Sequence, residues 1–360
     1  MGQISLTGGT LGAAAAAARL AKLGHAVTLV GDPGSVGGHW RTDLPPVFGL
    51  PAAWRDLFRK SGRMLDAELT RHGLVLEPAP AALHRFPDGL ELELPAERGA
   101  QFATISETIS PAAAARWRDL LDDLDDLWLA LRRAGLEQPR PAGRVPDELR
   151  RPGTLSRLAD RVREPHLARI ITSLGPRSGT DDAAAPALLA TRLVVERTFG
   201  RWQLADVSGP VPGMRLLDVL SGRLATRRVT FSPIVPPSQD AVVDLTNPRP
   251  DHRLFGPRVR PALAPTVTHP EGGLREVVEH TASGPVVTWA GVRHDFTAME
   301  PDLTWGYAPD SVRSWWARPA LASPLNEPWA ELSSAALRVY AAHADLTGED
   351  VRPSNRAYRP

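Results

Sequence analysis

The residues with the clearest chemical potential form one short turn near the N-terminus: Gly8, Gly9, Thr10 and Gly12. An alanine-rich stretch follows and predicts a helix over residues 13–23. A helix that begins at a glycine turn offers free N–H groups and the positive end of its dipole, which together attract phosphate groups. Thr10 departs from this chemistry, because it stands where the G-x-G-x-x-G pattern has the glycine closest to the phosphates.

Two apolar runs, residues 4–6 and 26–30, enclose this turn and helix and predict two strands. Strand, glycine turn, helix and strand together are typical of the first βαβ unit of a dinucleotide-binding fold. The second strand should end near an acid that accepts a ribose hydroxyl, and Asp32 stands one residue beyond that place. A scaffold that binds nothing is the alternative reading of the same unit.

Other candidate residues are histidines and one acid. His39 follows Gly37 and Gly38, a glycine pair that lets backbone approach a ligand, so it could face whatever the first turn holds. A surface histidine is the simpler reading. His294 and Asp295 could form an acid–base pair, although neighbouring residues of a strand point to opposite faces, and a loop or capping role is the alternative.

Composition excludes several classes of function. Lys and Arg number 42 against 41 Asp and Glu, so no charge excess favours a nucleic-acid partner. The absence of cysteine excludes disulfides and thiolate chemistry and favours a cytoplasmic protein. We expect no signal peptide and no transmembrane segment. We predict no metal site, since the acidic run at residues 122–126 is typical of a solvated helix face.

The remaining pattern predicts a mixed α/β chain with a helical insertion. Amphipathic spacing predicts helices over residues 51–63, 111–131, 154–174, 183–199, 214–224 and 328–344. Ser110 is the expected N-cap of the second of these helices, with Pro111 at its first position. Residues 85–94 predict a hairpin with leucines on one face and acids on the other, and residues 240–245 predict a short buried strand. Residues 111–199 therefore form a helical lobe between β-rich segments.

The order of these segments resembles the phytoene-desaturase-like branch of the FAD-dependent amine oxidase superfamily over nearly the whole chain. The resemblance is most specific at residues 198–202 and 212–214, which are similar to the family's F-G-x-W and G-G-M segments. Residues 36–38 match its second glycine pair, with His39 in place of the usual arginine. Residues 324–334 are similar to its closing flavin motif without the glycines.

The resemblance implies a Rossmann-like domain of the glutathione-reductase type with an inserted α+β substrate lobe. Residues 1–70, 205–250 and 285–360 would form the FAD-type domain, and residues 71–204 and 251–284 the lobe. Cofactor contacts are expected at the glycine turn, Asp32 and the second glycine pair, and in the closing motif at Asn326, Pro328 and Trp329.

Two functions remain open from the sequence. One is an FAD-dependent oxidoreductase, like a desaturase or amine oxidase, that acts on an apolar or amine-bearing small molecule. The other is a relative that has lost FAD and serves as a binding protein for a hydrophobic molecule or as an acid–base isomerase or cyclase. The altered residues at the cofactor contacts favour the second function, and the surviving glycine turn favours the first.

Overall fold

The N-terminal segment of the computed structural model is the predicted βαβ unit, with strand β1 (Gln3–Thr7), helix α1 (Leu11–Lys22) and strand β2 (Ala26–Val30). The structure describes residues 1–38, 40–44, 47–133, 147–150, 153–177, 185–245, 259–261, 266–267, 275–289, 292–295, 299–301 and 327–352. The two strands pair in parallel, as the crossover helix requires. The alanines of α1 are almost wholly buried, because their small side chains allow close packing on every side.

Four strands form the parallel sheet, in the order β10-β1-β2-β9. Strands β9 (Thr230–Ser232) and β10 (Ala241–Asp244) pair in parallel with β2 and β1 respectively. The predicted α/β fold class is therefore confirmed. The prediction that the strand near residue 240 is buried is wrong: β10 lies at the sheet edge, and the Val242 side chain is 53% exposed.

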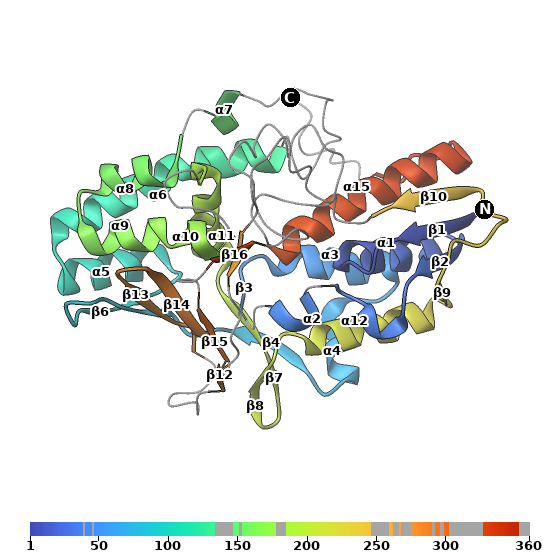
Figure 1. Cartoon of the computed structure of the whole chain (residues 1–360), viewed down its shortest axis with the longest axis horizontal. Coiled ribbons are helices and arrows are strands. Elements are labelled where there is room, and N and C mark those ends of the chain that lie inside the picture. The colour runs from blue at the N-terminus through green and yellow to red at the C-terminus, as the bar shows by residue number, and fades with distance from the viewer. Residues whose placement is uncertain are drawn as a thin grey trace.

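Helices α3 (Pro51–Ser61), α12 (Arg215–Thr226) and α15 (Pro328–Thr347) pack against α1. In Figure 1, α15 runs from the middle of the molecule along the parallel sheet toward the N-terminus. Leu57, Leu220 and Leu332 share one apolar core with α1 and the sheet. Three short elements lie between β2 and α3: the 3-10 helix η1 (Pro33–Ser35), helix α2 (Trp40–Asp43) and strand β3 (Val47–Phe48). Helix α4 (Leu65–Arg71) follows α3.

A second core belongs to the predicted helical lobe, at the left of Figure 1. Its longest helix, α6, begins after Ser110, whose hydroxyl accepts a hydrogen bond from the Ala113 N–H as predicted for an N-cap. Trp117 and Trp128 of α6 are buried in this core. The helices of the lobe are α5 (Arg98–Thr108), α6 (Pro111–Leu131), α7 (Asp147–Arg150), α8 (Leu155–Val162), α9 (Pro165–Thr172), α10 (Leu174–Arg177), η3 (Ala187–Ala190) and α11 (Thr191–Phe199).

Two long helices of this lobe were predicted wrongly. Residues 154–174 do not form one helix, because Arg163 adopts a left-handed φ of 50° and Pro165 begins a new helix, α9. Proline disfavours helical backbone in the residue before it and lacks the N–H that would continue α8. The helix predicted over residues 183–199 begins only after Pro186, and its first turn is the 3-10 helix η3, which continues directly into α11.

A six-stranded sheet, in the order β12-β15-β14-β13-β5-β6, lies beside the helical lobe. The predicted hairpin pairs as β5 (Ala82–Arg85) with β6 (Glu91–Leu94), and the leucines of β6 are buried while its glutamates are exposed. The sheet continues from β13 into the antiparallel strands β14 and β15. Its other strands are β12 (Thr266–Val267), β13 (Val277–Thr281), β14 (Gly284–Trp289) and β15 (Val292–Asp295).

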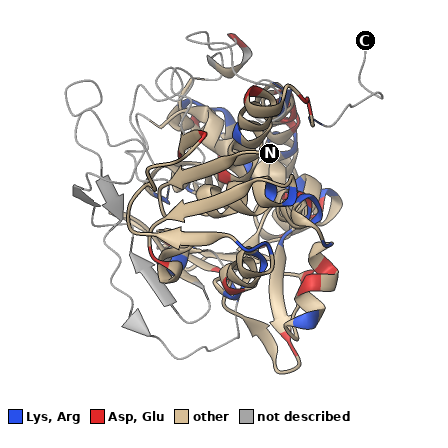
Figure 2. Cartoon of the chain, turned by 90° about the vertical axis from the view of Figure 1, so that its right-hand side faces the viewer, with Lys and Arg blue, Asp and Glu red and all other residues tan. Residues whose placement is uncertain are grey.

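The remaining strands form two small antiparallel groups. One contains β3, β4 (Val75–Pro78), β7 (Trp202–Asp206) and β8 (Gly209–Val211), and the other pairs β11 (Val259–Pro261) with β16 (Met299–Pro301). Within the described ranges, no helix combines the length and apolar character of a membrane span. Figure 2 shows the side of the molecule that lies at the right of Figure 1, where acidic and basic residues alternate along the helices.

Candidate functional site

The glycine turn lies at the carboxyl end of β1, where it leads into α1. Gly8 has a φ of 98°, which a residue with a side chain rarely adopts. Thr10 is the N-cap of α1: its hydroxyl accepts from the Ala13 N–H at 3.0 Å and donates to the Leu245 carbonyl at 3.1 Å. The sequence marked Thr10 as a departure from the glycine pattern, and the structure uses its side chain to cap the helix.

The Glu331 carboxylate occupies the N-terminus of α1. It reaches across from the first turn of α15, where its Oε1 accepts a hydrogen bond from the Gly12 N–H at 2.7 Å. Its Oε2 accepts from Trp40 Nε1, also at 2.7 Å. The Glu331 residue is only 5% exposed, and this burial raises the pKa of its carboxyl while the hydrogen bonds that the carboxyl makes oppose the rise. An acidic group of the chain itself therefore uses the amide that a helix N-terminus offers to an anion.

The second glycine pair closes over the same turn. A Cβ placed on Gly38 would lie 3.2 Å from the Gly9 carbonyl oxygen, so the two backbones are in direct contact. A Cβ placed on Gly9 would in turn lie 3.1 Å from Ser35 Oγ. Gly38 also has a left-handed φ of 57°. The structure thus brings the two predicted glycine segments together, with the loop after β2 packed against the turn.

Asp32 lies at the surface beyond β2. Its carboxylate accepts a hydrogen bond from the Gly34 N–H at 2.6 Å and thereby caps the 3-10 helix η1. The role expected from the sequence, a contact to a ribose hydroxyl, stays a prediction.

Pro328 and Trp329 open α15, where Trp329 is 3% exposed and packs edge-on against Trp128, with ring centroids 5.5 Å apart. Trp329 therefore joins α15 to the core of the helical lobe.

The other predicted site residues lie wholly or partly outside the described residues. His39 and Asn326 are outside them. His294 and Asp295 belong to strand β15, where they pair with Val287 and Val286 of β14 respectively. Their side chains are outside the described part of the structure. Among the residues that the structure describes, no cluster of three metal-ligating side chains occurs.

The residues at the turn do not fit the pyrophosphate of FAD in this arrangement. A bound pyrophosphate needs free N–H groups at the start of α1 and space before them. The N–H groups of Gly12 and Ala13 already donate to Glu331 and Thr10. Gly38 of the loop after β2 is in direct contact with Gly9, so this loop occupies space beside the turn that a pyrophosphate would need.

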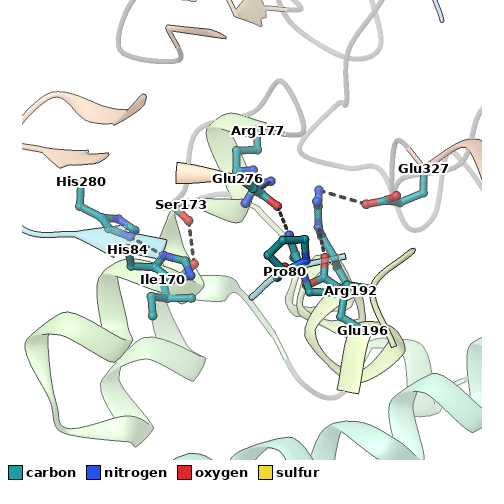
Figure 3. Close-up of polar contacts among 11 residues, drawn as sticks. Pro80, His84, Ile170, Ser173, Arg177, Arg192, Glu196, Glu276, His280 and Glu327 are labelled. Carbon is teal, nitrogen blue, oxygen red and sulfur yellow. Dashed lines mark hydrogen bonds and ion pairs between the residues drawn. The ribbon is translucent and has the colours of Figure 1, made fainter. Parts of the chain in front are cut away.

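A second polar centre, for which we made no prediction from the sequence, lies between the helical lobe and the start of α15. It is a buried network of arginines and glutamates around a small cavity, and Figure 3 shows its contacts. Its members come from segments far apart in the chain: Arg177, Arg192, Glu196, Arg201, Glu276 and Glu327. Only the pair Arg192 and Glu196, four residues apart on one helix, had a detectable spacing signal.

Comparisons with known proteins found similarity only among solved structures. No family model matches the chain, and no curated protein sequence matches it significantly. RAB GDI from Plasmodium falciparum is 9% identical with a TM-score of 0.44, covering 97% of this chain and 99% of that one. A protein from Pyrococcus furiosus is 11% identical with a TM-score of 0.46, covering 96% and 97%.

Cyclohexylamine oxidase from Brevibacterium oxydans is 14% identical, with a TM-score of 0.37 over 81% of this chain. The aligned part spans 55% of that oxidase. These scores and identities describe a distant similarity of chain path and say nothing about ligand or reaction. The class that the described structure itself defines is a Rossmann-like α/β protein with a glycine turn at the start of its first helix.

Proposed function

We propose that this protein works without FAD, as a binding protein built on a dinucleotide-binding fold. The observation that carries the FAD-free part of the proposal is the Glu331 carboxylate, which is buried and hydrogen-bonded to the Gly12 N–H and to Trp40 Nε1. The binding role is one of the FAD-free functions that the sequence leaves open. A hydrogen bond to a charged group contributes about 1.5–3 kcal/mol. FAD would have to displace both bonds and also separate Gly38 from Gly9.

A flavin-dependent oxidoreductase is the second candidate, supported by the meeting of the two glycine segments at the carboxyl end of β1. Ligands of open parallel sheets bind at this end of the strands. In this reading Gly8, Gly9 and Gly12 would face the pyrophosphate and Asp32 the ribose, and an apolar or amine-bearing molecule would be oxidised. Glu331 would first have to leave the start of α1.

The visible spectrum of the purified protein separates the two candidates. We expect a colourless protein that releases no flavin when it is denatured and whose melting temperature does not rise with added FAD. A yellow protein that releases about one flavin per chain would overturn the proposal and favour the oxidoreductase.

Replacing Glu331 tests whether its carboxylate excludes a pyrophosphate from the start of α1. In Glu331→Ala the Gly12 N–H loses its acceptor, so we expect added pyrophosphate or FAD to raise the melting temperature of this variant and not that of the parent protein. Glu331→Gln keeps an acceptor oxygen and should respond less. Glu349→Ala removes an exposed acid just beyond the same helix and serves as the matched control. Equal responses of the Glu331 and Glu349 variants would show that Glu331 does not close the site.

A further inference from the structure

Six charged side chains are gathered between the helical lobe and the start of α15, with three guanidinium groups facing three carboxylates. Figure 3 shows Arg192 between Glu196 and Glu327, with Glu276 below Arg177. Burying charges is costly unless each is paired and hydrogen-bonded, so the completeness of the pairing is informative.

Glu276 is the most fully paired carboxylate. Its Oε1 lies 2.5 Å from a terminal nitrogen of Arg177, and its Oε2 lies 2.6 Å from one of Arg201. The Glu276 side chain is 3% exposed. Burial opposes its ionisation, but the neighbouring arginines hold the pKa of Glu276 well below its usual range. Glu276 is therefore a fixed negative charge shared by two arginines.

Glu196 is held similarly, with its Oε2 2.7 Å from Arg201 and its Oε1 3.2 Å from Arg192 Nε. Glu327 is held less well. Its Oε1 lies 3.1 Å from Arg192, but this atom is buried and makes no hydrogen bond of good geometry. Burial raises the pKa of Glu327. Two firmly ionised carboxylates and one weakly held one thus face three arginines.

Arg177 is also incompletely satisfied. Its side chain is 7% exposed, and its Nε–H is buried without a hydrogen-bond partner. Burial and the nearby positive charge of Arg192 both lower the pKa of Arg177. The buried Nε–H groups of Arg19 and Arg223 also lack a partner, but Arg177 lines a cavity in which an acceptor has room.

A cavity of about 30 Å³ lies beside these groups. The three arginines, His84, Glu196 and Glu276 are among the residues that line it. A polar cavity needs roughly 10–15 Å³ to hold one water molecule, so this one has room for a small polar group of a few heavy atoms. Guanidinium groups bind planar carboxylates well, because their N–H donors match the two carboxylate oxygens.

We propose that this cavity binds a small carboxylate anion, of the size of formate or acetate, at the guanidinium groups of Arg177 and Arg192. The anion supplies the acceptor that Arg177 Nε lacks and a further negative charge beside Arg192, whose ion pair with Glu327 at 3.1 Å includes no hydrogen bond of good geometry. The lining of the cavity includes no residue of the glycine turn, although Glu327 stands four residues before Glu331 at the start of α15. The proposal does not depend on whether FAD binds at that turn.

The test measures thermal unfolding of the full chain with sodium formate or sodium acetate, against sodium chloride at the same ionic strength. We expect a saturable rise in melting temperature with the carboxylates beyond that with chloride, and binding heat for formate in calorimetry. Equal melting temperatures in all three salts, with no binding heat, would overturn the proposal.

Two variants with opposite expected effects separate binding from general stability. Glu327→Gln removes the carboxylate that competes for Arg192, so formate should bind about tenfold more tightly, as expected for one unit charge removed nearby. Arg177→Gln should abolish the formate effect, whereas Arg169→Gln, an exposed arginine of α9, should retain it. If Arg177→Gln does not fold, the Glu327→Gln affinity decides, and unchanged or weaker binding in that variant would refute the proposal.

Discussion

Acid should destabilise this protein through one buried histidine pair. Nδ1 of His84 in β5 lies 3.0 Å from Nε2 of His280 in β13, and the two residues are 4% and 5% exposed. The Phe86 ring stacks on His280, with centroids 4.7 Å apart. Burial lowers the pKa of His84 to about 3 and that of His280 to about 2.

The direction of the pH effect follows from where the protons bind. In the unfolded chain both imidazoles have a pKa near 6.5, so below that pH the unfolded state binds more protons than the folded state. The free energy of unfolding therefore falls as pH drops from 6.5 toward 3. At pH 5, which is 1.5 units below the unfolded value, each histidine costs about 2 kcal/mol and the pair about 4 kcal/mol.

Urea denaturation at pH 7.5 and pH 5 measures this loss. We compare the parent protein with the double variant His84→Leu/His280→Leu, which removes both imidazoles and leaves neither without its partner. The pH-dependent loss should shrink by about 4 kcal/mol in the double variant, whatever its stability at pH 7.5. The exposed His72 provides the control His72→Gln, which should keep the full loss. If the double variant and the parent lose the same free energy between the two pH values, the assignment to this pair is refuted.

Two further predictions concern stability. Glu68 and Arg223 form an ion pair at 2.5 Å, with both side chains 3% exposed. Glu68→Gln should cost about 3–5 kcal/mol because it leaves Arg223 buried with a weaker partner, and Glu68→Leu/Arg223→Met should recover much of that loss in urea denaturation. An equally unstable double variant would contradict this reasoning. Ser110→Ala removes the acceptor of the Ala113 N–H at the start of α6 and should cost about 1 kcal/mol, while Ser110→Asp should cost much less. Equal losses in the two Ser110 variants would exclude capping as the cause.

The local features of this protein could be predicted because they depend on neighbours in sequence. The spacing of apolar residues predicted β1, α1 and β2, and the Ser-Pro pair predicted the start of α6. Alternation predicted which face of β6 is buried. Even here, Pro165 was overlooked as the start of a separate helix, and β10 was predicted to be buried although it lies at an edge.

The contacts on which the proposed function and the proposed anion site rest join residues far apart in the sequence. Glu331 reaches Gly12 across 319 positions, because α15 packs along α1, and no periodicity in either segment specifies that meeting. Arg177 and Glu276 are 99 positions apart and meet only when the helical lobe packs beside the six-stranded sheet. The sequence by itself determined a glycine turn at the start of a helix, since turn and capping chemistry are local. Tertiary packing decided that a side chain of the same protein occupies it.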